Sequence, residues 1–203
     1  MLLRSNDYIF YPLMAVLAGA AIAIPLVMTG ADRVGVETDI RENGIVISGD
    51  RLQFLAAGQG VASQLLRDSD NRLFARVTAD TERGNPNLTA SAGVFDALRP
   101  YELDAISGFD LQVTYILKPG SDAPAASVDL GFFEDGLGQS YWTAHTLENG
   151  EASYSVTVDA PYCNPTFGFA GLWPSADTNA NSVDLYEIHI ETVADADCTE
   201  LPD

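Results

Sequence analysis

The residues of this chain best able to move protons are two histidines and one pair of adjacent acids. His145 and His189 both lie in alternating apolar and polar stretches typical of strands, where a lone histidine is more often structural than catalytic. Glu134 and Asp135 are neighbours, so in a strand they point to opposite faces, whereas glycoside hydrolysis needs two carboxyl groups that face one another across a sugar. No G-x-S-x-G, H-E-x-x-H or C-x-x-C motif occurs. The sequence therefore predicts a protein that is not an enzyme.

Three aromatic side chains are candidates for stacking on a sugar ring, namely Tyr141, Trp142 and Trp173. Tyr141 and Trp142 are neighbours in a strand-like stretch, so one of them points outward and the other inward. Trp173 precedes Pro174 at a strand end, where it could line a cleft. Two interpretations stay open: a platform for carbohydrate, or ordinary packing of large side chains in the core.

One loop is rich in the hard oxygen ligands that calcium prefers. Its four candidate ligands are Asp177, Asn179, Asn181 and Asp184. The loop begins like a D-x-N-x-N calcium loop, but the sixth position is Ser182 and the twelfth is Ile188 instead of glycine and glutamate. Asn and Asp are also common in ordinary turns. We expect no cofactor and keep a structural calcium ion at this loop as a hypothesis.

The chain has two cysteines, Cys163 and Cys198, which flank the last apolar strands. A pair of cysteines in an exported domain is expected to form a disulfide. Closing a loop of this size contributes about 3–4 kcal/mol in the chain-entropy model. The alternative is two unrelated thiols, but Cys198 lies in a polar tail where a free thiol would be exposed. We therefore expect a disulfide that fixes the C-terminal segment.

The most apolar segment is residues 8–29, an uncharged run of 22 residues. As a helix it spans about 33 Å, which matches a bilayer hydrocarbon core of about 30 Å. Apolar regions of signal peptides are usually about 7–15 residues long, so the run favours an uncleaved transmembrane helix. Small residues at positions 29–31 leave cleavage open as the alternative.

The predicted membrane helix carries small residues on one face. Ala15, Gly19 and Ala23 recur every four residues, a spacing that lets another helix approach closely. We expect this face to pack against transmembrane helices of a membrane complex. The predicted topology is residues 1–7 in the cytoplasm, residues 30–43 as a polar tether, and residues 44–203 as a periplasmic domain on a bacterial inner membrane.

The chain is strongly acidic, with a net charge of −19. The first 99 residues hold 11 acidic and 9 basic residues, a net charge of −2, and the remaining residues hold 18 acidic and one basic residue, a net charge of −17. Nucleic-acid binding needs Lys and Arg to displace counterions, so this class is excluded. The acidic half could attract a basic soluble protein. The alternative is adaptation to a saline habitat.

Short strand-like segments fill the region after the tether. They are separated by turn residues such as Asp135-Gly136 and Glu148-Asn149-Gly150. The segments are residues 44–48, 51–57, 72–79, 90–98, 109–117, 126–133, 141–147, 154–160, 166–173 and 182–193. No amphipathic helix is evident among them. The sequence predicts an all-β fold, an antiparallel β-sandwich or jelly roll, behind one N-terminal transmembrane helix.

Three segments of the second half carry a resemblance to a known group. They are Asp159-Ala160-Pro161, Phe167 to Trp173 and Val183 to Ile190. Together they resemble the closing strands of carbohydrate-binding-module-like, or galactose-binding-like, jelly rolls. The resemblance covers about 100 residues and consists mostly of packing positions. It implies a sandwich that binds sugars or displays a surface.

Two functions from different classes follow. The first is a non-catalytic single-pass accessory subunit of an inner-membrane complex, for example in respiratory or photosynthetic electron transfer, whose acidic β-sandwich binds other proteins. The alternative is a membrane-tethered carbohydrate-binding module of the cell envelope. The small-residue face of the helix and the uneven charge favour the first, because a sugar-binding module explains neither feature.

Overall fold

The computed structural model describes residues 36–87, 92–135, 142–177 and 180–200. The chain divides into two compact units, Met1–Asp39 and Ile40–Asp203. Every described strand belongs to the second unit. Residues 36–43 are helical, although the sequence predicts a polar tether there.

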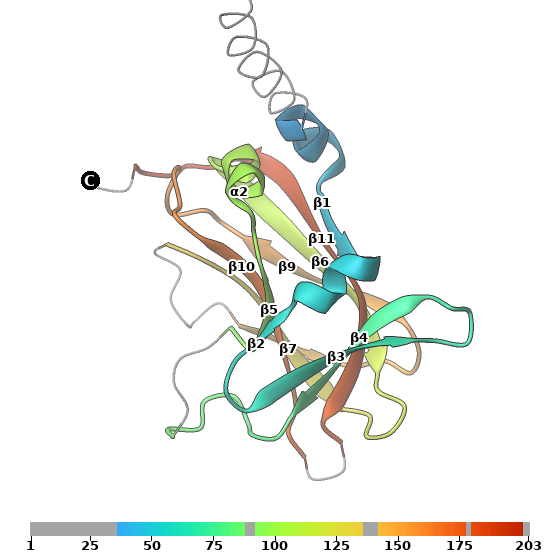
Figure 1. The fold of residues 1–203 in the computed structure, drawn as a ribbon. Coiled ribbons are helices and arrows are strands. Elements are labelled where there is room, and N and C mark those ends of the chain that lie inside the picture. The colour runs from blue at the N-terminus through green and yellow to red at the C-terminus, as the bar shows by residue number, and fades with distance from the viewer. Residues whose placement is uncertain (1–35, 88–91, 136–141, 178–179, 201–203) are drawn as a thin grey trace, which may run out of the picture. The chain divides into compact units, whose positions relative to one another are not determined.

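The described residues of the second unit form two antiparallel sheets (Figure 1). The six-stranded sheet has the order β3-β4-β11-β6-β9, and β1 also pairs with β11. Its strands are β1 (Ile45–Ser48), β3 (Val61–Arg67), β4 (Leu73–Ala79), β6 (Phe109–Pro119), β9 (Ala152–Val158) and β11 (Ser182–Asp195).

The five-stranded sheet has the order β2-β5-β10-β7-β8. Its strands are β2 (Ala56–Ala57), β5 (Val94–Ala97), β7 (Ser127–Glu134), β8 (Thr143–Thr146) and β10 (Gly168–Pro174). From β4 onward the chain crosses to the other sheet at every connection except β7 to β8. This alternation confirms the predicted all-β antiparallel sandwich.

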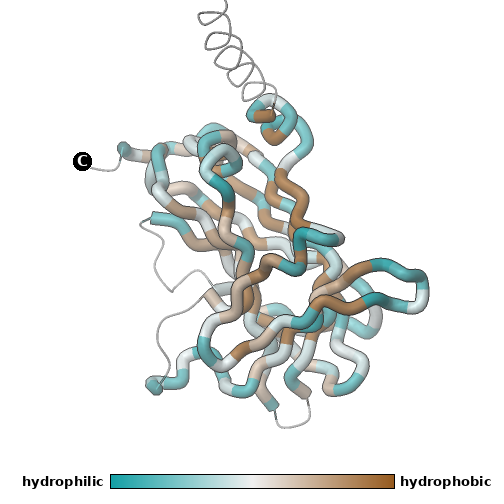
Figure 2. Tube along the Cα trace, viewed as in Figure 1, coloured by the Kyte–Doolittle hydropathy of each residue, from teal (hydrophilic) through white to brown (hydrophobic). Residues whose placement is uncertain are grey.

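The core lies between the two sheets, because alternate residues of each strand point inward. On β6 the inward residues Leu111, Val113, Tyr115 and Leu117 are fully buried. The Tyr115 hydroxyl donates a hydrogen bond of 2.8 Å to the carbonyl oxygen of Gly131 on β7, so the one polar atom of this row is satisfied. Figure 2 shows the apolar residues along the strands and hydrophilic residues at the tip of the β3–β4 hairpin.

Two local predictions are wrong. Residues 51–57 form the 3-10 helix η1 (Gly49–Phe54) followed by β2, since Leu52 alone is buried and Phe54 is 69% exposed. The sequence analysis also missed β3, of which only Val61 is buried. This edge strand has little apolar alternation, and alternation was the signal by which the other strands were recognised.

A short helix, α2 (Pro100–Ile106), was also missed. Pro100 occupies the first helical turn, and Glu102 accepts a hydrogen bond of 2.9 Å from the backbone N–H of Arg99. Proline followed by an acidic residue in the first turn is a helix-start signal. The helix has seven residues, too few for a helical period to stand out.

Arg51 on η1 forms a part-buried ion cluster with two acids from separate elements. Its guanidinium lies 2.6 Å from Asp96 on β5 and 2.5 Å from Glu102 on α2. Both carboxylates are at least 94% buried at their side chains. The cluster ties η1 and α2 to the five-stranded sheet.

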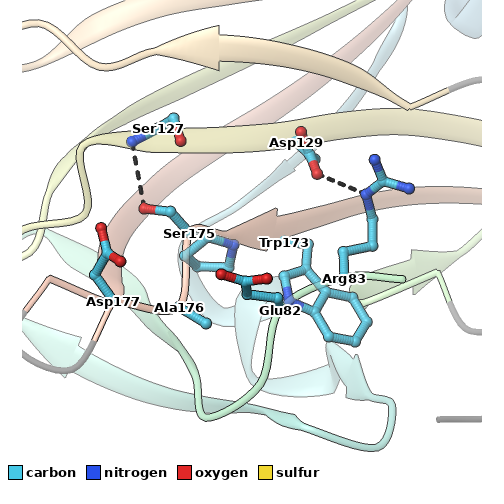
Figure 3. A pocket seen from close by; sticks show the side chains of 9 residues that line it. Glu82, Arg83, Ser127, Asp129, Trp173, Ser175, Ala176 and Asp177 are labelled. Carbon is cyan, nitrogen blue, oxygen red and sulfur yellow. Dashed lines mark hydrogen bonds and ion pairs between the residues drawn. The ribbon is translucent and has the colours of Figure 1, made fainter. Parts of the chain in front are cut away.

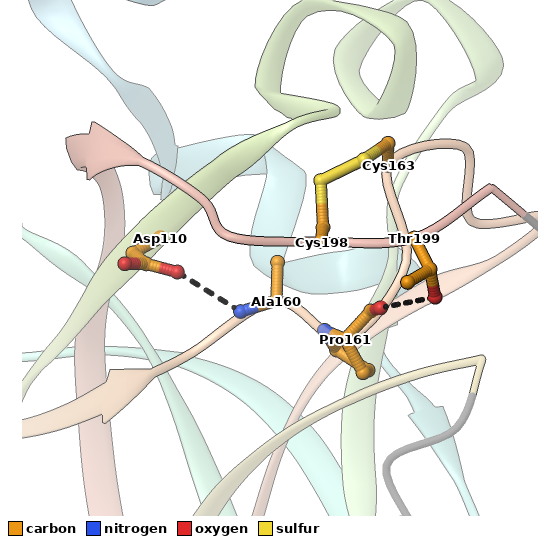
Figure 4. The surroundings of a disulfide bond; sticks show 6 residues. All are labelled: Asp110, Ala160, Pro161, Cys163, Cys198 and Thr199. Atoms are coloured by element: carbon orange, nitrogen blue, oxygen red, sulfur yellow. Dashed lines mark hydrogen bonds between the residues drawn. A yellow bond between two sulfur atoms is a disulfide. The ribbon is translucent and has the colours of Figure 1, made fainter.

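The predicted disulfide between Cys163 and Cys198 is confirmed (Figure 4). The bond fastens the segment after β11 to the loop after β9. Two backbone hydrogen bonds accompany it, from Cys163 N–H to Thr199 and from Thr199 N–H to Pro161. These contacts hold residues 198–199 of the C-terminal segment against residues 161–163 of the loop after β9.

The predicted transmembrane helix, residues 8–29, lies outside the described residues, as do Ala15, Gly19 and Ala23. Within the described ranges, no helix is both long and apolar enough to cross a membrane.

Candidate functional site

The outer face of the five-stranded sheet carries an unusual number of aromatic rings. On β10 the residues Ala170 and Leu172 face the other sheet, so Phe169, Gly171 and Trp173 lie on the opposite face of the strand, where Trp173 is nevertheless buried as part of the hydrophobic core. The strand register places Phe133 of β7 directly beside Phe169. The aromatic side chains of three strands therefore converge on this face.

Three of these rings form what we call the phenylalanine platform, made of Phe95, Phe167 and Phe169. The Phe95 and Phe169 ring centroids lie 5.1 Å apart, and the Phe167 and Phe169 rings are stacked with centroids 5.1 Å apart. Phe167 is 36% exposed, and the other two rings are half-buried. An exposed group of apolar rings on a globular domain indicates a contact surface.

The end of the platform is fixed by a polar clamp. The Asp135 carboxylate accepts hydrogen bonds from the backbone N–H of Thr166 and, at 2.8 Å, from its hydroxyl. Because Thr166 directly precedes Phe167, these bonds link the start of the platform to the end of β7. The platform is therefore held at its edge.

A polar hollow, which we call the Asp129 pocket, lies at the other end of the same face (Figure 3). Its volume is about 260 Å³. It is lined by Glu82, Arg83, Ser127, Asp129, Trp173, Pro174, Ser175, Ala176 and Asp177. Arg83 donates a hydrogen bond of 2.5 Å to Asp129. The pocket thus combines several carboxylates, two hydroxyls and one guanidinium around the edge of an indole ring.

Between the platform and the pocket, the backbone of Ala92 and Gly93, which leads into β5, packs directly against the backbone of β10. A Cβ atom on Gly93 would come within 2.3 Å of the carbonyl oxygen of Leu172, and φ of Gly93 is +75°. A Cβ on Gly171 would come within 2.2 Å of the carbonyl oxygen of Ala92. Both positions need glycine because two backbones meet there.

The predicted aromatic candidates take different places. Trp173 is 3% exposed and its indole N–H donates to the carbonyl oxygen of Thr81, so only its edge reaches the pocket. Trp142 is half-buried; its ring packs edge-on against Phe133 with centroids 4.9 Å apart, and the Arg83 guanidinium lies 5.3 Å from its centroid. Tyr141 lies outside the described residues.

Those predicted calcium ligands that the structure describes are not brought together. Asp184 is buried on β11 and pairs with Arg76 at 2.7 Å, and the Asn181 amide donates to the carbonyl oxygen of Ala79. Asp177 lines the Asp129 pocket, and Asn179 lies outside the described ranges. In the part of the chain that the structure describes, no group of three or more His, Cys, Asp or Glu could hold a metal ion. The calcium site stays a prediction.

The residues considered for proton transfer are dispersed. Glu134 is 2% exposed at the end of β7, and burial, followed by the charge of Asp135, raises its pKa to about 7. Burial lowers the pKa of His145, partly opposed by Asp129. His189, on β11 of the six-stranded sheet, makes a 3.0 Å contact with the carbonyl oxygen of Asn43. No described pair of carboxyl groups faces across the platform.

The sequence analysis missed the residues that form this face. One local signal could have found two of them, because Phe167 and Phe169 alternate with small residues and so share a strand face. Phe95 and Arg83 have no such signal. They reach the site through strand pairing and through the loop after β4.

No protein-family model matches this chain, and no curated protein matches it in sequence. Solved structures do match. The CBM22-1–CBM22-2 tandem of Paenibacillus barcinonensis Xyn10C superposes with a TM-score of 0.51 at 19% identity, over 75% of this chain and 46% of the tandem. This chain therefore spans about half of that tandem.

Two single modules are also similar. The CBM22-1 xylan-binding domain of the same Paenibacillus protein has a TM-score of 0.47 at 17% identity, over 75% of this chain and 95% of the domain. The C-terminal family 22 carbohydrate-binding module of Clostridium thermocellum Xyn10B has a TM-score of 0.48 at 12% identity, over 78% of this chain and 98% of the module.

At these identities the likeness establishes the fold alone. It confirms the carbohydrate-binding-module-like β-sandwich that the closing strands resemble. The similar structures include carbohydrate-binding modules and an arabinofuranosidase. None of the structures named here is described as an accessory subunit of a respiratory or photosynthetic complex.

Proposed function

We propose that this protein is a non-catalytic carbohydrate-binding module that holds a glycan on the outer face of its five-stranded sheet. The observation that carries the proposal is the phenylalanine platform beside the Asp129 pocket. The fold agrees, since the tandem module that superposes with a TM-score of 0.51 is itself built of carbohydrate-binding modules.

The platform suits the apolar face of a sugar ring. Pyranose C–H groups are attracted to the negative face of an aromatic ring, and the contact removes apolar surface from water. The three phenylalanine rings form one apolar cluster with neighbouring centroids at 5.1 Å, of which Phe167 is the most exposed, and hold no hydroxyl that would need a fixed partner. Such a surface is tolerant of the sugar's identity.

The Asp129 pocket suits the hydroxyl groups of a sugar. A hydroxyl both donates and accepts, so it matches a site in which carboxylate acceptors lie beside a guanidinium donor. The Arg83 and Asp129 side chains are 34% and 23% exposed, so both are reachable from solvent. The pocket therefore orients the sugar through hydrogen bonds, and the platform provides the apolar contact area.

The two regions are far enough apart for a chain of several sugars. Phe167 directly precedes β10 and Trp173 lies six residues further along the chain, which corresponds to at most about 20 Å in an extended segment. We therefore propose an oligosaccharide or polysaccharide ligand, and expect longer oligomers to bind more tightly than a monosaccharide.

The test is calorimetric titration of the full-length protein with xylan-derived, cellulose-derived, mannan-derived and galactan-derived oligosaccharides. Sugar-headed detergents are avoided because they would compete. Phe169→Ala is expected to lower affinity for the best ligand at least about tenfold, equivalent to about 1.4 kcal/mol. Arg83→Met is expected to weaken it as well.

The matched control is Phe54→Ala, which removes an equally large ring that is 69% exposed on η1 and belongs neither to the phenylalanine platform nor to the lining of the Asp129 pocket. Its affinity is expected to equal that of the parent protein. If no oligosaccharide binds, or if Phe54→Ala loses as much affinity as Phe169→Ala, the proposed function is wrong.

We also propose that residues 8–29 tether the module to the outer side of a bacterial inner membrane. Their apolar length supports this, and so does the disulfide, since structural disulfides persist in oxidising compartments. Carbonate extraction of native membranes tests it: the full-length protein is expected to stay in the pellet, and its release would contradict a membrane-spanning tether.

A further inference from the structure

The six-stranded sheet is interrupted along one edge of β11. β1 pairs with β11 up to Ser48, opposite Glu187, and β4 takes over only at Ala75, opposite Leu185. Between them, at Tyr186, the register of β11 against β6 shifts by a β-bulge. Bulges often lie next to functional sites, because they re-aim a side chain and leave a gap in the pairing.

A hollow of about 280 Å³ opens at this interruption. It is lined by Ser48, Gly49, Arg72, Leu73, Ile116, Glu151, Tyr186 and Glu187. The volume is close to the lower end of small-molecule pockets, about 300 Å³. Because these residues belong to the six-stranded sheet and its margins, the hollow is separate from the platform.

Tyr186 is the unusual member of this lining. The residue is 5% exposed, and among the described residues no partner meets its hydroxyl at strict hydrogen-bond geometry. Arg72 and Lys118 nevertheless lie near enough to interact with the phenolic oxygen, which raises the pKa of Lys118 and, after Glu151, the pKa of Arg72. The Arg72 guanidinium lies over the ring at 4.0 Å from its centroid, and the Lys118 ammonium is 4.9 Å from it. A buried tyrosine hydroxyl normally has a partner, so this one has bonding capacity to spare.

Arg72 is held over Tyr186 by weak interactions. Its side chain is 52% exposed, and its ion pairs, with Glu151 and at 3.5 Å with Asp68, lie at the surface. Exposed ion pairs of this kind contribute little. A ligand can therefore move the guanidinium aside and reach the ring and hydroxyl of Tyr186 while Arg72 itself becomes a donor at the rim.

The lining chemistry matches a neutral sugar unit. Leu73, Ile116 and the tyrosine ring are apolar, whereas Ser48 and Arg72 donate and the two glutamates of the lining accept. The cations of Arg72 and of nearby Lys118 are balanced by the two carboxylates of the lining, so the hollow does not favour an anion. We propose that this hollow is a second saccharide site on the sheet opposite the phenylalanine platform, an inference that rests on the proposed function.

Calorimetry and tryptophan fluorescence together test the proposal in the full-length protein. Both tryptophans of the chain, Trp142 and Trp173, contact the face that carries the platform, so fluorescence reports that site and calorimetry counts both. When the parent protein is titrated with xylotetraose or with cellotetraose, calorimetry is expected to detect two binding sites per chain and fluorescence one. The Phe169→Ala variant is expected to retain one site, and binding at that site is expected to leave the fluorescence unchanged.

Tyr186→Phe is the decisive variant, because it removes only the hydroxyl group and leaves the ring and its packing intact. In the Phe169→Ala background it is expected to weaken the remaining site at least threefold. Ser155→Ala, an exposed position on β9 of the same sheet, is expected to change nothing.

The outcomes separate the two proposals. One molecule per chain that Phe169→Ala abolishes would overturn the second site and leave the proposed function standing. A second site that Tyr186→Phe and Ser155→Ala affect equally would also overturn its assignment to this hollow. Absence of binding in every variant would overturn both.

Discussion

Glu134 allows the pH dependence of stability to be worked out from the structure. Its carboxyl group is buried at the end of β7, opposite Gly168 of β10, and among the described residues its Oε1 atom has no hydrogen-bond partner. Burial, and secondly the charge of Asp135, raises its pKa from 4.5 to about 7. The folded state therefore favours the protonated carboxyl.

The sign and size follow from linkage. Below pH 4.5 the carboxyl is protonated in both the folded and the unfolded state, and its contribution to stability is fully present. As pH rises through 7, the unfolded chain releases its proton first and the contribution is lost. At about 1.4 kcal/mol per pKa unit, the loss between pH 4.5 and pH 8 is about 3 kcal/mol.

Glu134→Gln removes this titration while keeping the shape of the side chain. The difference in free energy of unfolding, variant minus parent, is expected to be about 3 kcal/mol more positive at pH 8 than at pH 4.5. Urea unfolding at pH 4.5, 6 and 8, with the disulfide intact and equal m-values, measures it. Other titrating groups cancel in the difference.

Glu148→Gln is the control, since Glu148 is exposed in the turn before β9. This variant measures the effect of the carboxyl-to-amide change at a position that is not buried. If Glu134→Gln behaved in the same way as this control, Glu134 would be titrating as a solvated carboxyl, and the argument from burial would be refuted.

Three further predictions concern stability. Arg51→Met leaves two buried carboxylates without their counter-charge and is expected to cost about 3–5 kcal/mol, seen as a lower urea midpoint; an unchanged midpoint would contradict the ion cluster. Cys163→Ser with Cys198→Ser is expected to cost about 3–4 kcal/mol, and dithiothreitol should then lower the Tm of the parent but not of the variant. Burial lowers the pKa of His145 below 6.5, so its stability contribution is lost as pH falls from 6.5; His145→Gln is expected to lose less stability between pH 7 and pH 5, and equal losses would argue against this.

The sequence predicted the fold more completely than it predicted the candidate site. Alternating residues predicted the central strands β4, β6 and β11, because each has one face in the core and one outside it. Edge strand β3 and the seven-residue α2 were missed, since neither buries enough residues at a regular period. Residues 51–57 have a strand-like sequence pattern, but it covers too few positions to distinguish a strand from a 3-10 helix.

The disulfide was predictable for a different reason. Two cysteines leave only one intrachain pairing, and a polar tail around Cys198 makes a free thiol unfavourable there. No knowledge of the sheet order was needed for this prediction.

What the sequence by itself determined is the β-sandwich class, most strand positions, the disulfide and the acidic charge, all of which depend on local pattern or on composition. The tertiary structure alone decided that Phe95 lies beside Phe169, that Arg83 meets Asp129, and that Trp173 is covered. These contacts join residues far apart in the chain through the order and register of the strands. That order depends on how two whole sheets pack their inner faces together, which no short segment encodes.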